Sequence, residues 1–403
     1  MSDVGRIQAA LDDGTLLHPI DAAIPSSVDL GAALAHLAGA PMDLGPHARK
    51  LIDDLRIEGD LPQHTVFVLV DGLGCNLIDA IAPDAFFPAH TVRELRAVFP
   101  STTAAALTSI ATAAWPAQHA IPAWFTHLPE LGRTAIILPF VERTTRQPLN
   151  ELGVSPDVVY PHPTTFASMT ADAHTYHPDR IAGSVYTAYQ KGPATGEGYD
   201  SLDEVVESIS GWIAAAKGRT YHYLYVPDVD VAEHEFGHGA PQVRAALERV
   251  QTAVATLAAT LADLAGRTRV VISTDHGHLE VADAHKHIVE PDDPLLDDLS
   301  VPFSGEPRVP MFHVKQGHER AFEAAFRERF GHAFALLTST EAEQLQLFGP
   351  GSLGATARAR IGDYIALAPG PDVLVYQPDG NAGLRGFHAG LSPSEMRIPL
   401  ILA

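Results

Sequence analysis

Three apolar runs that end in acidic residues constrain the fold of this chain more than any other feature. The run 65–70 is followed by Asp71-Gly72, the run 221–226 by Pro-Asp-Val-Asp, and the run 269–274 by Asp-His-Gly. Continuous apolar runs of this length are typical of parallel strands buried on both faces. Ligands of such sheets bind outside the carboxyl ends of the strands. The pattern therefore predicts that acidic side chains converge at one edge of a sheet.

Helical segments lie between these runs. Residues 202–216 and 242–264 are rich in Ala and Leu at helical spacing. Strands that alternate with helices favour an α/β fold of three layers, in which helices flank a mostly parallel central sheet. A chain of 403 residues has room for one large domain of this kind with a small α+β insertion.

The composition and the pattern of expected elements change after Asp283, which predicts the α+β insertion at about 290–380. We expect a loop at 290–306, rich in Pro and Asp, and a strand, a helix and a strand at 308–314, 319–330 and 334–338. The chain then returns to the core, with a last strand at 398–402. We expect residues 1–60 to decorate a main domain at 61–403, and to contain one helix near 30–38.

The charge and the single cysteine narrow the class of protein. Asp plus Glu number 49 against 27 Lys plus Arg, for a net charge of -22, which argues against a nucleic-acid polymer as partner. An acidic chain can still bind a small phosphate ester if metal cations reverse the local field. Cys75 has no partner for an internal disulfide, and no leader or membrane-spanning run is found. We expect a soluble, cytoplasmic protein without a membrane partner; its oligomeric state stays open.

Two motifs carry metal-ligand chemistry. Asp230 and His234 are four residues apart, so one helical turn places both on the same face, although Asp228 and His238 lie close enough to take their place. In Asp275-His276-Gly277, a bend after the strand lets adjacent side chains point the same way, and the glycine permits the sharp turn.

Each remaining signal also has an ordinary structural reading. Asp71-Gly72 is common in hairpin turns, and His388 alone is only a loop histidine. The stretch Pro100-Ser101-Thr102-Thr103 opens a helix, where Ser or Thr usually caps the first turn. The functional reading is a hydroxyl nucleophile at a helix N-terminus, whose free N–H groups hold a phosphate.

The order of these motifs resembles the alkaline phosphatase superfamily, most closely its type I phosphodiesterase/nucleotide pyrophosphatase branch. Members of this branch read Pro-Thr-Lys-Thr, then Ser-Ile-Val-Thr-Gly and Tyr-Pro-Glu-Ser-His-Gly. This chain has Pro-Ser-Thr-Thr at 100–103, Ser-Ile-Ala-Thr-Ala at 109–113 and Trp-Pro-Ala-Gln-His-Ala at 115–120. The resemblance covers about 65–403, and its register selects Thr103 as the nucleophile over Thr102.

The resemblance implies a two-metal hydrolase of phosphodiester or pyrophosphate bonds that acts on small phosphate esters or nucleotides through a phospho-threonine. The ions would be Zn²⁺, with Mn²⁺ or Fe as alternatives. The implied ligands of one ion are Asp71, Thr103, Asp275 and His276. Those of the other are Asp230, His234 and His388.

Two departures concern the substrate. Trp124 stands where this branch has an Asn for a phosphate oxygen, and His278 follows the Asp-His-Gly motif where Met is usual. No Cys-x-Pro-x-Arg is present, which argues against the sulfatase branch. Phosphomonoester or phosphonate hydrolysis on the same scaffold remains an alternative. A non-catalytic binding protein stabilised by a closed metal site is the alternative from another class.

Overall fold

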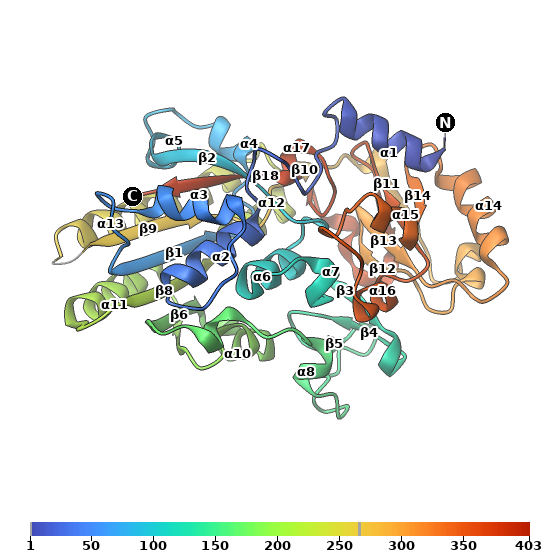
Figure 1. The fold of residues 1–403 in the computed structure, drawn as a ribbon. Helices are drawn as coiled ribbons and strands as arrows, with labels where there is room; N and C mark the ends of the chain where they lie inside the picture. The colour runs from blue at the N-terminus through green and yellow to red at the C-terminus, as the bar shows by residue number, and fades with distance from the viewer. Residues whose placement is uncertain (1, 265–266) are drawn as a thin grey trace.

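Two seven-stranded sheets lie side by side in the computed structural model, which describes residues 2–264 and 267–403 (Figure 1). The strands of the first sheet, in spatial order, are β2 (Thr91–Arg96), β18 (Arg397–Leu402), β9 (Thr268–Ser273), β1 (His64–Val70), β8 (Thr220–Val226), β6 (Asp172–Pro178) and β7 (Thr195–Tyr199).

The first sheet is parallel from β9 to β7, and β18 runs antiparallel to both of its neighbours. The three apolar runs that the sequence singled out are β1, β8 and β9, at the centre of this sheet. The helices lie on both of its faces, so the predicted α/β class with a mostly parallel central sheet is confirmed. Because β1 pairs with β8 and β9 in register, the carboxyl ends of all three strands are level.

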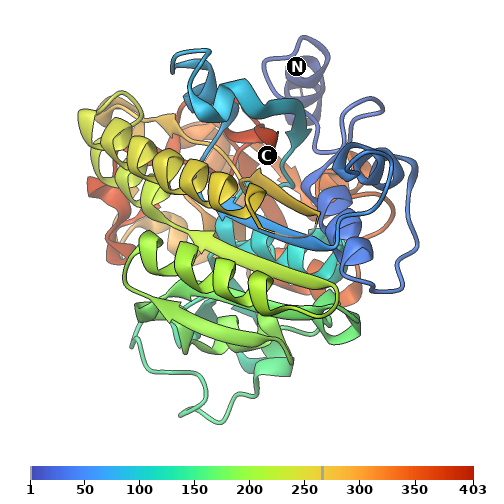
Figure 2. The same ribbon diagram turned by 90° about the vertical axis from the view of Figure 1, so that its left-hand side faces the viewer.

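Strand β1 shows why both faces need helices, since its side chains alternate between two hydrophobic clusters. Phe67 and Leu69 belong to the cluster on the side of the N-terminal helices, whereas Val66, Val68 and Val70 belong to the cluster on the opposite side. Figure 2 shows the long helices of that second side in front of the sheet. The first side carries α2 (Ser27–Leu37), α3 (Pro46–Leu55) and α6 (Thr103–Thr112), and the second carries α11 (Leu202–Ala215) and α13 (Pro241–Ala262).

The second sheet is antiparallel and joins two distant parts of the chain. Its order is β14 (Ala335–Thr338), β15 (Tyr364–Leu367), β13 (Val309–Phe312), β12 (Ser304–Glu306), β3 (Phe125–Leu128), β4 (Arg133–Ile136) and β5 (Val141–Glu142). The prediction of a loop at 290–306 is wrong at its end, because Ser-Gly-Glu forms β12. Its sequence has no strand-forming residue, and pairing with β13 and β3 overrides that weak propensity.

The helix predicted at 319–330 is α14 (Glu319–Phe330), which covers the second sheet with a buried row of Phe322, Phe326 and Phe330. Besides α1, the remaining α-helices of the described ranges are α4 (Cys75–Asp79), α5 (Phe86–His90), α7 (Pro116–His119), α8 (Pro156–Val159), α9 (Asp179–Ala182), α10 (Val185–Lys191), α12 (Asp228–Phe236), α15 (Ser339–Gln344), α16 (Ala355–Ile361) and α17 (Pro393–Met396). Two strand pairs complete the structure: β10 (Leu279–Glu280) with β17 (Gly386–Phe387), and β11 (Lys286–Val289) with β16 (Val373–Tyr376).

The first 60 residues, expected as a decoration, contact both sheets. Helix α2 contributes Leu30 and Leu34 to the core and crosses α6 so closely that a Cβ on Gly31 would lie 2.5 Å from the Ile110 carbonyl oxygen. From α1 (Asp3–Asp12), the Arg6 guanidinium donates to the carbonyls of Gly331 and Phe334 at 2.7 and 3.0 Å. The predicted domain boundaries stay a prediction, but this segment is part of the packed structure.

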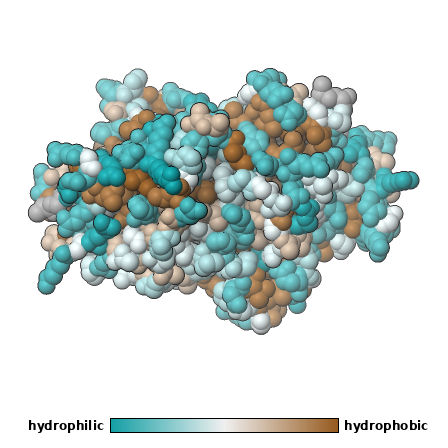
Figure 3. All heavy atoms as spheres, viewed as in Figure 1, coloured by the Kyte–Doolittle hydropathy of each residue, from teal (hydrophilic) through white to brown (hydrophobic). Residues whose placement is uncertain are grey.

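The surface fits the acidic composition. Figure 3 shows one face that is mostly hydrophilic, with apolar groups in separate patches. Within the described ranges, the exposed large hydrophobic side chains are Val92, Trp212, Val231 and Phe236. No helix in residues 2–264 and 267–403 has both the length and the apolar character that a bilayer crossing requires.

A buried ion pair ties the second sheet to the segment that carries His388. Arg308, beside β13, is fully buried and donates through Nε and Nη2 to both oxygens of Glu395 in α17, each at 3.0 Å. Glu395 also accepts from the Gly390 backbone N–H at 2.7 Å. Burial disfavours the charged form of Glu395, but the charge and hydrogen bonds of Arg308, with those of Ser392 and the Gly390 N–H, outweigh burial and lower the pKa of Glu395.

Replacing Arg308 with Met is expected to lower the free energy of unfolding by about 3–5 kcal/mol, because it leaves the Glu395 carboxylate buried and unpaired. Equilibrium denaturation in urea measures the change. The double variant Arg308→Met, Glu395→Leu should recover much of the loss, since both charges are then removed. A loss well below about 1 kcal/mol in the single variant would contradict the role given to this pair.

Candidate active site

The site begins where the three central strands end. Asp71 follows β1, Asp275 follows β9, and helix α12 begins two residues after β8 and carries Asp230. The Gly72 N–H lies 3.3 Å from Asp275 Oδ1, and the Asp230 N–H donates to the Asp71 carbonyl at 3.1 Å. Gly72 has φ +77°, and a Cβ there would lie 2.9 Å from Asp230 Cα, so only glycine fits this turn. The hairpin reading of Asp71-Gly72 is wrong, because β1 pairs in parallel on both sides.

The first cluster joins two strand ends to the start of helix α6. His276 Nε2 lies 3.5 Å from Asp71 Oδ1, 3.3 Å from Asp275 Oδ2 and 3.1 Å from Thr103 Oγ1. The two carboxylates and the imidazole are almost completely buried, and Thr103 is 7% exposed. The four side chains that the resemblance assigned to one ion thus lie together.

The second cluster contains the three side chains assigned to the other ion. Asp230 and His234 are one turn apart in α12, with Oδ1 and Nε2 3.5 Å from each other. His388, which follows β17, places its Nε2 3.2 Å from that of His234. The rings of His276 and His388 stack with centroids 3.7 Å apart, so the two clusters are adjacent.

Backbone carbonyls fix the orientation of these histidines. Nδ1 of His234 lies 2.8 Å from the Gly386 oxygen, and Nδ1 of His388 lies 3.1 Å from the Ser101 oxygen. A carbonyl oxygen only accepts, so each Nδ1 carries the hydrogen and each Nε2 turns a lone pair toward the site. Two lone pairs at 3.2 Å repel each other unless a cation lies between them.

The carboxylates also lack partners. Asp71 Oδ1, Asp230 Oδ1 and Asp275 Oδ2 are buried and have no hydrogen bond within the described part of the chain. Burial, and then the charges of Asp275 and Asp230, raise the pKa of Asp71. The Tyr225 hydroxyl donates to Asp71 Oδ2 at 2.5 Å and offsets this rise in part. Orphaned oxygens that face unprotonated imidazoles are a donor set suited to divalent metal ions, and two His/Asp groups with ligand spacing are present.

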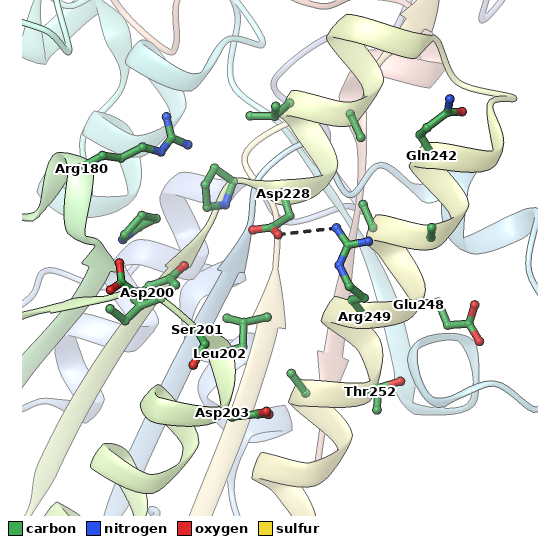
Figure 4. A pocket seen from close by; sticks show the side chains of 18 of the residues that line it. Arg180, Asp200, Ser201, Leu202, Asp203, Asp228, Gln242, Glu248, Arg249 and Thr252 are labelled. Carbon is green, nitrogen blue, oxygen red and sulfur yellow. Dashed lines mark ion pairs between the residues drawn. The ribbon is translucent and has the colours of Figure 1, made fainter.

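The alternatives considered for the second cluster lie elsewhere. His238 Nδ1 is 3.0 Å from Glu233 Oε1, and Asp228 pairs with Arg249 at 3.9 Å. Figure 4 shows that pair in an open groove of about 1140 Å³ beside the site, with Arg180 at its edge.

Thr102 does not cap helix α6, contrary to the ordinary reading of this sequence. It occupies the N-cap position, but its hydroxyl donates to Glu306 Oε1 at 2.6 Å. The same oxygen accepts the Trp124 N–H, also at 2.6 Å. The N–H groups of the first turn therefore have no side-chain cap, which leaves them available to an anion.

Two cavities meet at Thr103. One, of about 550 Å³, extends past His234, His388 and Glu306, and the other, of about 500 Å³, extends past Tyr186 and Tyr225. Both are also lined by Trp124, Asp230 and Val231. A group bound at Thr103 can therefore carry a substituent on each side.

Comparisons with known proteins decide the family. The sequence profile of the family "Type I phosphodiesterase / nucleotide pyrophosphatase" matches residues 65–390. The chain belongs to this family. It is therefore an enzyme of the phosphoric ester hydrolase class, as the motifs predicted. No curated protein matches the chain.

Solved structures of ectonucleotide pyrophosphatase/phosphodiesterase 5 share this fold at low identity. The murine protein superposes with a TM-score of 0.63 at 15% identity, over 83% of this chain and 87% of that one. The human protein gives 0.64 at 15% identity, over 84% and 87%. A second murine structure, with the same values as the first, is described as an inactive threonine-to-alanine variant in complex with AMP.

The sequence did not reveal the part that three residues of the present chain play in this site. Tyr225 and Glu306 come from β8 and β12, and their roles depend on contacts that no local motif reveals. His278 was noticed only as a departure from the family pattern, although its Nε2 lies 3.2 Å from Asp230 Oδ1.

Replacing Asp71 with Asn is expected to stabilise the metal-free protein by about 0.5–2 kcal/mol, because it removes one of three buried carboxylates that repel one another. Thermal unfolding in a strong chelator measures this gain, and saturating divalent metal should reverse its sign. Asp228→Asn, on the same side of the sheet but partly exposed, is the control and should change little. A loss of stability of Asp71→Asn in chelator would contradict the electrostatic argument.

Proposed function

We propose that this enzyme hydrolyses phosphodiester or pyrophosphate bonds of small, nucleotide-like esters, with Thr103 as nucleophile and two divalent metal ions. The observation that carries the proposal is the position of the Thr103 hydroxyl, 3.1 Å from His276 Nε2 and within the first Asp/His cluster. A closed structural metal site would have no nucleophile beside it. The two cavities that meet at Thr103 favour an active site over a binding protein.

The proposed ligands divide as the two clusters do. Zn²⁺ suits these imidazole and carboxylate donors best, and Mn²⁺ and Fe suit them as well. Bound there, the ions would lower the pKa of the Thr103 hydroxyl and neutralise charge on the phosphoryl group. One ion would be held by Asp71, Thr103, Asp275 and His276, and the other by Asp230, His234 and His388.

The chain itself positions the reaction. Thr103 is the first residue of α6, so the uncapped N–H groups of that turn face the same phosphoryl group that its hydroxyl attacks. Attack forms a phospho-threonine and expels the leaving alcohol or phosphate, and water then releases the phosphoryl group from Thr103. The murine neighbour that was made inactive by a threonine-to-alanine change, and holds AMP, supports this role.

Charge around the nucleophile favours diesters over monoesters. A monoester dianion needs an additional cation for its extra non-bridging oxygen. Arg143 is held by Asp379 at 2.5–2.7 Å, and Lys286 donates to Asp283 at 2.8 Å. The cavity beside His388 instead carries Glu306, whose pKa burial raises to about 7.

Hydrolysis of phosphomonoesters or phosphonates is the second candidate. Arg180 lines the cavity on the Tyr225 side of Thr103 and is the cation that this activity would use. A diester has no equivalent need for it, so the two candidates differ in their dependence on this one side chain.

The purified protein is expected to hold about two transition-metal ions per chain and to lose activity when they are removed. Elemental analysis and a chelator titration measure both quantities. His388→Ala should weaken one ion in particular, because this residue supplies a donor from a distant segment. Full activity in a strong chelator, with no bound metal, would exclude the two-metal mechanism.

Thr103→Ala is expected to abolish turnover, whereas Thr102→Ala should retain most of it, because only Thr103 reaches the Asp/His cluster. Thr103→Ser should keep part of the activity, since it retains a hydroxyl. Single-turnover kinetics with trapping of the phospho-enzyme checks this order. Equal losses in the two alanine variants would mean that the nucleophile is misassigned.

Diesters are expected to give a higher kcat/KM than monoesters with the same leaving group. Glu306→Gln should lower the diester-to-monoester ratio of kcat/KM by about tenfold or less. The amide oxygen of this variant can still accept from Thr102 and Trp124, but the variant lacks the negative charge that Glu306 carries when the pH is above its raised pKa of about 7. Matched aryl substrates measure both ratios. A preference of the wild type for the monoester would overturn the diester assignment and leave the second candidate, which Arg180→Gln then tests.

A further inference from the structure

His278 is a histidine of the site that the two proposed ligand sets do not use. It lies just before β10, which Figure 1 labels, and β10 pairs with β17, the strand that leads to His388. Its side chain is 1% exposed, and its ring centroid lies 4.9 Å from those of both His234 and His388. The ring therefore belongs to the wall of the second cluster.

Neither ring nitrogen of His278 has a hydrogen-bond partner among the described residues, and neither has Asp230 Oδ1. Nε2 and Oδ1 are only 3.2 Å apart, so distance does not prevent a bond. The two groups form an electrostatic contact that does not meet the geometry of a hydrogen bond. An imidazole buried without partners is costly, and such a group needs an explanation.

The spacing of the two atoms matches that of atoms that share an ion. Bonds of about 2.0–2.2 Å to a tetrahedral ion separate neighbouring ligand atoms by roughly 3.3–3.6 Å. The proposed ligand pairs show 3.1–3.5 Å, and His278 to Asp230 shows 3.2 Å. Donor atoms of Asp230, His276, His278 and His388 also lie within 4.8 Å of one another.

The fold reserves space for this ring. A Cβ on Gly72 would lie 3.0 Å from His278 Cε1, and one on Gly386 would lie 3.3 Å from Cδ2, so two glycines border the ring. The Asn76 amide donates to the His278 carbonyl at 3.0 Å and holds the backbone after the Asp-His-Gly bend. The ring is thus held next to Asp230 by its surroundings and not by a hydrogen bond of its own.

We propose that His278 is an additional protein ligand of the ion held by Asp230, His234 and His388. The inference rests on the proposed two-metal centre and adds a donor that the family pattern, with Met at this place, lacks. It explains why His278 Nε2 and Asp230 Oδ1 lack hydrogen-bond partners in the protein alone. An ion with this extra imidazole binds more tightly and has one position fewer for substrate.

The test compares wild type with His278→Met and His278→Gln. Met keeps the volume and restores the family residue, whereas Gln can still donate a hydrogen bond to Asp230 but is a poor ligand. His238→Gln, a histidine of the same region that pairs with Glu233, is the matched control. Metal content after dialysis, competition titrations with a chelator and the visible absorption of the Co²⁺ forms are measured for each protein.

The wild type and the control are expected to hold two ions. Both His278 variants should bind one of the two at least about 10–100-fold more weakly and change the Co²⁺ spectrum, with the other ion unaffected. Wild-type metal affinity and Co²⁺ spectrum in His278→Gln would show that His278 acts only as a polar neighbour of Asp230. Wild-type values in His278→Met would show that no donor is needed at this position. Either result would overturn this inference and leave the proposed function standing. A wild-type protein that binds no divalent ion overturns the proposed function as well.

Discussion

The repulsion among three buried carboxylates is the constraint on which the site depends. The parallel register of β1 with β8 and β9 brings Asp71, Asp230 and Asp275 to one edge of the sheet, where burial strengthens their mutual repulsion. The chain offsets this cost only in part, through the Tyr225 hydroxyl and the Gly72 N–H. Burial raises the pKa of Asp230, but His234 and His278 beside it outweigh burial and lower that pKa, whereas the pKa of Asp71 stays raised. The folded protein therefore has an excess of negative charge at this edge of the sheet, which the proposed divalent cations would neutralise beside the proposed phosphate site.

The second sheet completes this site from segments remote in the sequence. Glu306 comes from β12, and Trp124 precedes β3. The ring of His388 contacts the Ser101 carbonyl. The backbone two residues after His388 donates to Glu395, which is paired with Arg308. Both walls of the cavity beside His388 thus depend on contacts between the sheets. A change in that contact would move a proposed metal ligand and the carboxylate that bears on substrate charge at the same time.

The parts of the fold that could be predicted are those whose signal is local. Continuous apolar runs predicted β1, β8 and β9 because central parallel strands are apolar on both faces. The helix predicted at 319–330 is α14. β12 could not be predicted, since three residues carry no periodicity and pairing alone makes them a strand. The proposed ligands could be named because a known family shares their order. The positions of Tyr225, Glu306 and His278 in the site could not be predicted, because each depends on a contact with a residue from a distant segment.

Adjacent threonines with opposite roles connect the fold to the proposed chemistry. An N-cap hydroxyl usually contributes about 1 kcal/mol by bonding the first turn of its helix. Thr102 instead directs its hydroxyl to Glu306, which leaves the first turn of α6 uncapped beside the Thr103 hydroxyl. A bound phosphate would accept from those N–H groups and so replace the missing cap. Since charge on the non-bridging oxygens persists as the phosphoryl group transfers, the same N–H groups would hold substrate and phospho-threonine alike. The helix would thus be less stable without a bound phosphate, and the proposed substrate would supply the N-terminal cap that Thr102 does not provide.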